Sequence, residues 1–123
     1  MGKSKIDPQY VPAKLKAKQY YGQIVRIWCP ALDSYINFNR SGFRHLIWKK
    51  SDQRTKKEQQ RRFALLPYAA RIISAPEALI KYQERNVARF WAFTGMYDDK
   101  PIKLIVRRIG NKQKHFFSIF KDK

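Results

Sequence analysis

Residues 87–120 decide the fold of this chain, and they read VARFWAFTGMYDDKPIKLIVRRIGNKQKHFFSIF. Aromatic and β-branched residues, which are enriched in β-strands, dominate three runs in it: 87–97, 102–109 and 115–120. The two connections between these runs, DDKP at 98–101 and GNKQ at 110–113, are rich in turn-forming residues. The segment therefore predicts consecutive antiparallel strands joined by tight turns.

The residues before this meander carry both strand-like and helix-like patterns. Short strands are predicted at 22–28, 35–38 and 79–82. Helical spacing of apolar residues runs through 43–48 and, after a charged stretch, through 63–73, where Pro67 either ends one helix or begins another. Asn39 or Ser41 can begin the first helix, and Ser51 or Asp52 the second. We expect an α+β fold in which helices pack on a C-terminal antiparallel sheet of about four strands.

The N-terminal residues differ from the rest. Residues 1–21 are rich in lysine, contain Pro8 and Pro12, and show almost no periodic apolar pattern. We predict a basic flexible arm there, followed by a single domain over residues 22–123. A chain of 123 residues fits one domain of this kind.

The net charge of the chain restricts its partners. The sequence has 27 Lys plus Arg against 9 Asp plus Glu, a formal charge of +18, and 15% of its residues are aromatic. Such a surface selects polyanions, namely RNA, DNA, an anionic membrane or an acidic protein. The cations are spread along the whole chain, whereas a membrane-binding helix concentrates them on one face. Nucleic acid is therefore the favoured partner.

Several site types are disfavoured by composition. Cys29 is the one cysteine, and with two histidines there are too few ligands for a structural zinc site. The acidic residues are scattered, which disfavours a magnesium-dependent nuclease. We therefore expect no cofactor. No apolar run is long enough to span a bilayer and no signal peptide is visible, so a cytoplasmic site of action is predicted.

His45 is the leading candidate for proton transfer. Arg44 is adjacent and Lys49 is near, and like charges favour the neutral imidazole that a general base requires. RNA is a substrate for which His, Lys, Arg and Ser suffice, because its own 2′-hydroxyl is the nucleophile. The products would be a 2′,3′-cyclic phosphate and a 5′-hydroxyl. The alternative is a partly exposed histidine without a catalytic task.

The last strand allows two interpretations. Strict alternation places Phe116, Ser118 and Phe120 on one face, and His115 and Phe117 on the other. This face is either a core surface with one small hydroxyl, or an exposed surface on which aromatic rings stack unpaired bases while Ser118 contacts a phosphate.

With these residues, the chain resembles the ribonucleases grouped as barnase, EndoU, colicin D and RelE-like, in particular their phage-borne and polymorphic-toxin branches. The resemblance covers about residue 23 to the C-terminus. It rests on FRHLIWK at 43–49, on a middle helix ending in LP at 66–67 and APE at 75–77, and on FSIF at 117–120. It implies His45 as acid or base, Ser118 as phosphate contact and Phe120 as aromatic support.

The resemblance has further implications. It implies transfer RNA or another structured RNA as substrate, an acidic immunity or antitoxin protein as partner, and delivery or encoding by a mobile element. Arg107 and Arg108 would clamp the phosphate. The complete set of candidate residues is catalytic His45, Ser118, Arg107 and Arg108, with Arg44, Lys49, Arg54, His115 and Phe120 binding the substrate. A non-catalytic RNA- or DNA-binding protein, and an adaptor that docks on an acidic protein, are the alternatives.

Overall fold

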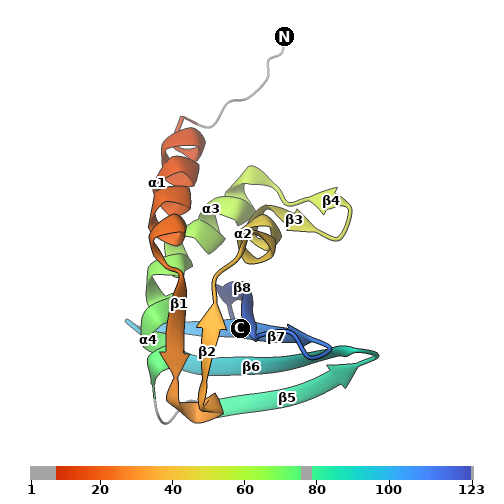
Figure 1. Cartoon of the computed structure of the whole chain (residues 1–123). Coiled ribbons are helices and arrows are strands. Elements are labelled where there is room, and N and C mark those ends of the chain that lie inside the picture. Colours follow the sequence, from red (N-terminus) through yellow and green to blue (C-terminus); the bar gives the residue numbers. More distant parts are fainter. Residues whose placement is uncertain (1–7, 76–78, 123) are drawn as a thin grey trace.

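The computed structural model describes residues 8–75 and 79–122, which form an α+β structure (Figure 1). A curled mixed sheet has the strand order β1-β2-β8-β7-β6-β5. Its strands are β1 (Arg26–Cys29), β2 (Ser34–Asn37), β5 (Leu79–Arg85), β6 (Ala88–Tyr97), β7 (Lys100–Ile109) and β8 (His115–Lys121). The α-helices are α1 (Tyr10–Gln23), α2 (Arg40–Ile47), α3 (Lys56–Leu65) and α4 (Ala69–Ser74). Shorter elements are the 3₁₀ turns η1 (Pro30–Leu32) and η2 (Leu66–Tyr68) and the hairpin of β3 (Trp48–Lys49) and β4 (Asp52–Gln53).

The predicted meander is confirmed. Strand β7 pairs antiparallel with β6 on one side and with β8 on the other. Tyr97 pairs with Lys100, so the β6–β7 turn consists of Asp98 and Asp99, whose φ angles are 50° and 62°. Asp tolerates this left-handed conformation better than most residues, and two such residues in succession match the twist of a hairpin. The local turn chemistry therefore sets the register of the two longest strands.

The sheet is larger than predicted. The sequence predicts about four antiparallel strands, and the structure has six, of which β1 and β2 form an added hairpin. Strand β2 joins β8 in parallel through the single pair Asn37 and His115, next to a hydrogen bond from the Asn37 N–H to the Lys114 carbonyl. This long-range pairing has no local sequence signal, which is why the two short strands were predicted but their place in the sheet was not.

Residues 10–21, predicted as part of a flexible arm, belong to helix α1. Tyr10, Ala17 and Tyr21 are buried on one side of this helix. The Tyr21 hydroxyl donates a hydrogen bond to the Asn39 carbonyl at 2.6 Å, which ties α1 to the start of α2. The intervening lysines hide this spacing of seven and four residues in the sequence. The boundary predicted at residue 22 therefore falls inside a helix, and residues 1–7 of the predicted arm lie outside the described residues.

The two faces of the meander differ in burial. Phe93, Leu104, Val106 and Ile119 are fully buried on one face. On the opposite face, Phe90, Ala92, Ile105 and Arg107 are only half-buried. Helices α2 and α3 contact β8, and in Figure 1 strands β6 and β5 extend away beneath them. The half-buried face is therefore the part of the sheet on which a ligand has access.

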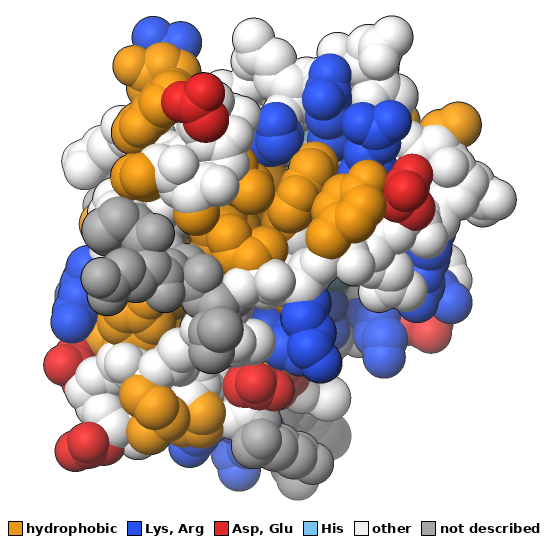
Figure 2. Space-filling view, turned by 90° about the horizontal axis from the view of Figure 1, so that it is seen from below, with side chains coloured by type: hydrophobic (Ala, Val, Ile, Leu, Met, Phe, Trp, Pro, Cys, Tyr) orange, Lys and Arg blue, Asp and Glu red, His pale blue; other side chains and the backbone are white. Residues whose placement is uncertain are grey.

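The molecular surface also combines apolar and cationic side chains. Figure 2 shows hydrophobic side chains gathered in the middle of one face, with Lys and Arg side chains beside them. Trp28 and Tyr35 form one exposed aromatic pair, with ring centroids 5.0 Å apart, and Tyr82 contacts Trp91 at 5.4 Å. The +18 charge is thus accompanied by exposed rings, as the composition predicts.

Candidate active site

A β-bulge in β8 builds the centre of the candidate site. Val106 pairs with Phe116 and Ile105 pairs with Ser118, so Phe117 is the extra residue between them. Phe116 is buried and stacks on Phe38 at 5.0 Å, whereas Phe117 contacts Phe90 on the half-buried face at 5.7 Å. Because the bulge adds one residue, the alternation predicted for this strand fails at Phe117.

His45 stacks on Phe117. Their ring centroids lie 4.1 Å apart with an interplanar angle of 28°. Helix α2 brings His45 there, and it begins as predicted at Asn39, whose side-chain oxygen accepts a hydrogen bond from the Gly42 N–H at 3.1 Å. A Cβ at Gly42 would collide with the Phe116 carbonyl oxygen and the Tyr21 hydroxyl, so glycine at this position lets α2 approach β8.

The His45 imidazole is neutral at physiological pH. Burial, together with the charges of Arg54, Arg62 and Arg107, lowers its pKa to about 4. The neutral form was predicted, but the sequence attributes it to Arg44 and Lys49. In the structure Arg44 and Lys49 are exposed, and the charges that lower the pKa belong to three other arginines: one in α3, one in the loop before it and one in β7. A neutral imidazole can accept a proton.

Arg107 is the second group at Phe117. Its guanidinium carbon lies 4.3 Å from the centre of the Phe117 ring. Its Nε donates a hydrogen bond to His115 Nε2 at 2.9 Å, and Nη2 donates to Ser41 Oγ at 3.3 Å. A guanidinium has five N–H groups, so these two bonds leave donors for a ligand. His45, Arg107 and Phe117, with the supporting His115 and Arg54, are called the Phe117 cluster below.

His115 and Arg54 position the two main groups. His115, predicted to bind substrate, is buried and accepts from Arg107, and burial together with the Arg107 charge lowers its pKa. Its role in this structure is to hold Arg107. Arg54 donates from Nε to the His45 carbonyl oxygen at 3.1 Å and so joins the end of α2 to the segment before α3.

Ser118 is not available to a phosphate. It is 3% exposed, and its hydroxyl oxygen accepts a hydrogen bond from Arg62 Nη1 at 2.8 Å. Arg62 also pairs with Glu58 at 2.9 Å and lies over the Phe120 ring at 5.2 Å. The predicted role of Ser118 as phosphate contact is therefore corrected, because its hydroxyl is buried against a partner. Glu58, Arg62, Ser118 and Phe120 are called the Ser118 cluster below.

Three predicted residues lie away from the Phe117 cluster. Arg108 follows Arg107 on the strand, so its side chain points to the opposite face, where Nε donates to the Lys112 carbonyl at 2.9 Å. Arg44 lies over the Trp48 ring at 5.1 Å, and Lys49 is exposed in β3. The catalytic role predicted for Arg108 is corrected, because neighbouring strand residues alternate between faces.

Sequence reasoning missed three contributors. Phe117 was predicted on the face of the last strand opposite to Ser118, Ser41 was considered only as a helix cap, and Arg62 was not among the predicted site residues. The one available signal was the spacing of Glu58 and Arg62, since residues four apart on a helix form ion pairs.

Two depressions flank the Phe117 cluster. One, of about 550 Å³, is lined by the rings of Phe90, Phe117 and Phe120 and by Lys81 and Lys103. The other, of about 440 Å³, is lined by Arg107 and His115 together with Asn39, Ser41 and Lys112. One side thus offers aromatic rings and the other hydrogen-bond donors. A nucleotide presents the matching groups, a flat base and a phosphate.

Two further findings concern metal ligands and membranes. In the described part of the chain, no three His, Cys, Asp or Glu side chains converge as a metal site would require. Among residues 8–75 and 79–122, no helix has both the length and the apolar character needed to cross a membrane.

No family model, no curated protein and no solved structure matches this chain.

Proposed function

We propose that this chain is a metal-independent endoribonuclease whose active site is the Phe117 cluster. One observation carries the proposal. A neutral, half-buried imidazole and a guanidinium contact the same aromatic ring, at 4.1 Å and 4.3 Å, beside two depressions that are open to solvent. A base, a cation and a stacking surface are the three groups that cleavage by the 2′-hydroxyl needs from a protein.

The proposed reaction assigns one role to each group. His45 accepts the proton of the 2′-hydroxyl while the 2′-oxygen forms a bond to phosphorus. Arg107 donates hydrogen bonds to the phosphate oxygens, on which negative charge grows. The bond from phosphorus to the 5′-oxygen then breaks, and that oxygen takes a proton from the imidazolium or from water. The products are a 2′,3′-cyclic phosphate and a 5′-hydroxyl, and the ring of Phe117 or Phe90 supports a neighbouring base.

A bound phosphate makes His45 a better base. The pKa of about 4 arises from burial and then from three nearby arginines. A phosphodiester beside Arg107 offsets that positive charge, so the pKa of His45 rises toward neutrality when RNA binds. Proton transfer is most efficient when the pKa lies near the working pH. The imidazole is therefore neutral in the free protein, and the binding of substrate raises its pKa.

Substrate and partner follow from the resemblance and the charge. We propose a structured RNA, transfer RNA first, as substrate. We also propose an acidic inhibitor protein that covers the basic site, because complementary charge speeds such capture. These two assignments rest on the +18 charge and on the resemblance, whereas the reaction type rests on the Phe117 cluster.

A second candidate function is RNA binding without cleavage. His115 is buried and bonded to Arg107, so half-buried His45 is the histidine assigned to proton transfer, and a second histidine that could act as the acid is missing from the described part of the chain. The His45 ring also stacks on Phe117 as a packing group would. Phe90, Phe117, Lys81 and Lys103 would hold single-stranded RNA equally well without chemistry.

The experiment that separates these two functions is incubation of the purified protein with total transfer RNA in EDTA. Endoribonuclease activity predicts discrete fragments that carry cyclic phosphate ends at one cut terminus and 5′-hydroxyls at the other. The His45→Ala protein, shown to be folded by circular dichroism, serves as the control for contaminating nucleases. Intact RNA at high protein concentration, together with measurable binding, would contradict endoribonuclease activity and support RNA binding without cleavage.

A further inference from the structure

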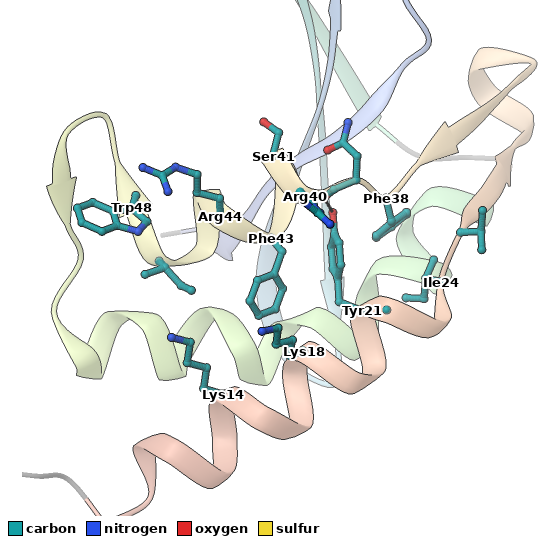
Figure 3. A pocket seen from close by; sticks show the side chains of 14 residues that line it. Lys14, Lys18, Tyr21, Ile24, Phe38, Arg40, Ser41, Phe43, Arg44 and Trp48 are labelled. Atoms are coloured by element: carbon teal, nitrogen blue, oxygen red, sulfur yellow. Dashed lines mark hydrogen bonds between the residues drawn. The ribbon is translucent and has the colours of Figure 1, made fainter.

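A groove of about 820 Å³ lies between α1 and α2. Helix α1 contributes Lys14 and Lys18, and helix α2 contributes Arg40 and Arg44 (Figure 3). In Figure 3 both lysine side chains rise from α1 toward α2. The groove lies on the side of α2 away from His45, since Phe43 and Ile47 line it.

The cations of this groove have no acidic partner among the described residues. Its lining contains no Asp or Glu. The ion pairs in the described part of the chain use other cations, namely Arg61, Arg62, Arg71, Arg89 and Lys103. Four uncompensated positive charges around one depression favour a ligand that carries several negative charges.

The apolar part of the groove is aromatic. Phe43 and Trp48 are half-exposed and line it, and Tyr21 and Phe38 form its deeper wall. Phe43 is fixed from behind, because it stacks on Phe63 at 6.1 Å and meets the edge of Tyr21 at 5.3 Å. Rigid rings between cations are the pattern on which successive bases of a single strand stack.

The groove continues into the Phe117 cluster. Asn39 and Ser41 line both the groove and the depression that holds Arg107 and His115. The Ser41 hydroxyl accepts a hydrogen bond from Arg107 itself. A strand that lies in the groove therefore leads, across Ser41, to the phosphate position assigned to Arg107.

From these four observations we infer that the α1–α2 groove binds a single-stranded segment of RNA, with bases on Phe43 and Trp48 and phosphates on Lys18, Arg40 and their neighbours. The inference rests on the proposed function only in that the same strand would continue to Arg107. The groove itself needs no cleavage to bind. An acidic protein is the competing occupant, and the test below distinguishes it.

The probe is a fluorescein-labelled 2′-O-methyl oligouridylate of about ten nucleotides. Its blocked 2′-oxygens prevent cleavage, so anisotropy in EDTA measures binding whether or not the chain is a nuclease. Failure of this inference and failure of the nuclease proposal are then separate results. An unlabelled oligonucleotide and a polyglutamate of equal charge are the two competitors.

The main variant is Lys18→Ala/Arg40→Ala, and the matched control is Lys16→Ala/Lys57→Ala. Both remove two exposed cations, but Lys16 and Lys57 do not line the groove. The groove variant should bind about tenfold more weakly and reduce the salt slope of log K by about 1.4, because two phosphate contacts are lost. The control should change affinity by less than about twofold. Equal changes in both variants would overturn the inference.

Base stacking is tested by Trp48→Leu, with the exposed Trp28→Leu as its control. Loss of one stacking ring should weaken binding about fivefold or more, and the Trp28 variant should bind as the wild type does. Unchanged binding by a folded Trp48 variant, or displacement of the probe by polyglutamate as effectively as by the oligonucleotide, would show a general acidic-ligand site and reject the RNA groove. If Trp48→Leu does not fold, the comparison of Lys18→Ala/Arg40→Ala with Lys16→Ala/Lys57→Ala still tests whether the groove binds RNA.

Discussion

Phe117 and Ser118 are neighbours in the chain, yet they lie in two clusters with opposite character. In the Ser118 cluster the charged groups are paired with each other: Arg62 forms an ion pair with Glu58 and also donates a hydrogen bond to the buried serine hydroxyl. At Phe117 the arginine donates only to neutral acceptors, His115 and Ser41. Both clusters contain a guanidinium over a phenylalanine ring, at 5.2 Å from Phe120 and 4.3 Å from Phe117. The difference is the carboxylate of Glu58.

The presence or absence of a carboxylate partner distinguishes an arginine with a structural role from one that is available to bind a ligand. A buried charge needs compensation, and Glu58 supplies it for Arg62 within the protein. Arg107 has no carboxylate partner among the described residues and lies beside an open depression. Compensation for Arg107 is therefore left to an anion from solution, and a phosphodiester is the anion that we propose.

Removing the imidazole should have the largest effect. We expect His45→Ala to lower RNA cleavage by about 10²–10⁴-fold, the usual contribution of a general acid or base, with RNA affinity almost unchanged. Cleavage rates and anisotropy on the same protein measure the two quantities. Lys57→Ala, which removes an exposed cation of α3 that lines neither the groove nor the two depressions, is the control. A fall in affinity as large as the fall in rate would make His45 a binding or packing residue.

Disruption of the Ser118 cluster should lower the free energy of unfolding. Arg62→Met removes the partner of the buried Ser118 hydroxyl and of Glu58, so the free energy of unfolding should fall by about 2–3 kcal/mol. Arg61→Ala, which removes an exposed member of the same helix, should change it by less than about 0.5 kcal/mol. Urea unfolding measures both values. Equal stability of the two variants would contradict the structural role of Arg62.

A smaller effect is expected for Ser118→Ala. The loss of one buried hydrogen bond should lower the free energy of unfolding by about 1 kcal/mol. RNA cleavage by the folded variant should remain within about twofold of the wild type, because the hydroxyl is buried against Arg62 and contacts no substrate. A large loss of activity with retained stability would restore the phosphate-contact role that the sequence predicts for Ser118.

The last prediction concerns the pH dependence of stability. Folding lowers the pKa of His45 from 6.5 to about 4, so between these values the unfolded chain binds this proton more readily than the folded chain does. Stability therefore rises with pH across that window, and His115, whose pKa is also lowered, contributes in the same direction. His45→Gln should reduce the difference between urea midpoints at pH 4.5 and pH 7. An unchanged or larger difference would contradict the burial of a neutral His45.

Local chemistry explains which parts of the fold the sequence predicts correctly. The turn at Asp98 and Asp99 and the cap at Asn39 depend on neighbouring residues only, and both predictions are confirmed. Helix α1 was missed because its buried side, Tyr10, Ala17 and Tyr21, is interrupted by lysines. The pairing of β2 with β8 depends on residues far apart in the chain, so no local pattern reveals it.

The structure places two of the predicted site residues, His45 and Arg107, against the same ring, Phe117, and places Ser118 in a different cluster. The bulge at Phe117 separates Ser118 from Phe116, although strict alternation places these two residues on one face. A bulge cannot be read from HFFSIF, where aromatic residues occupy both faces of an ideal strand.

The most direct test of the central claim compares wild type, Ser118→Ala and His45→Ala on one transfer RNA preparation in EDTA, with all three proteins shown to be folded. The claim that the Phe117 cluster is catalytic and the Ser118 cluster structural predicts cyclic phosphate fragments from the first two proteins at similar rates and almost none from the third. Intact RNA with all three, or equal cleavage by His45→Ala and wild type, would contradict it.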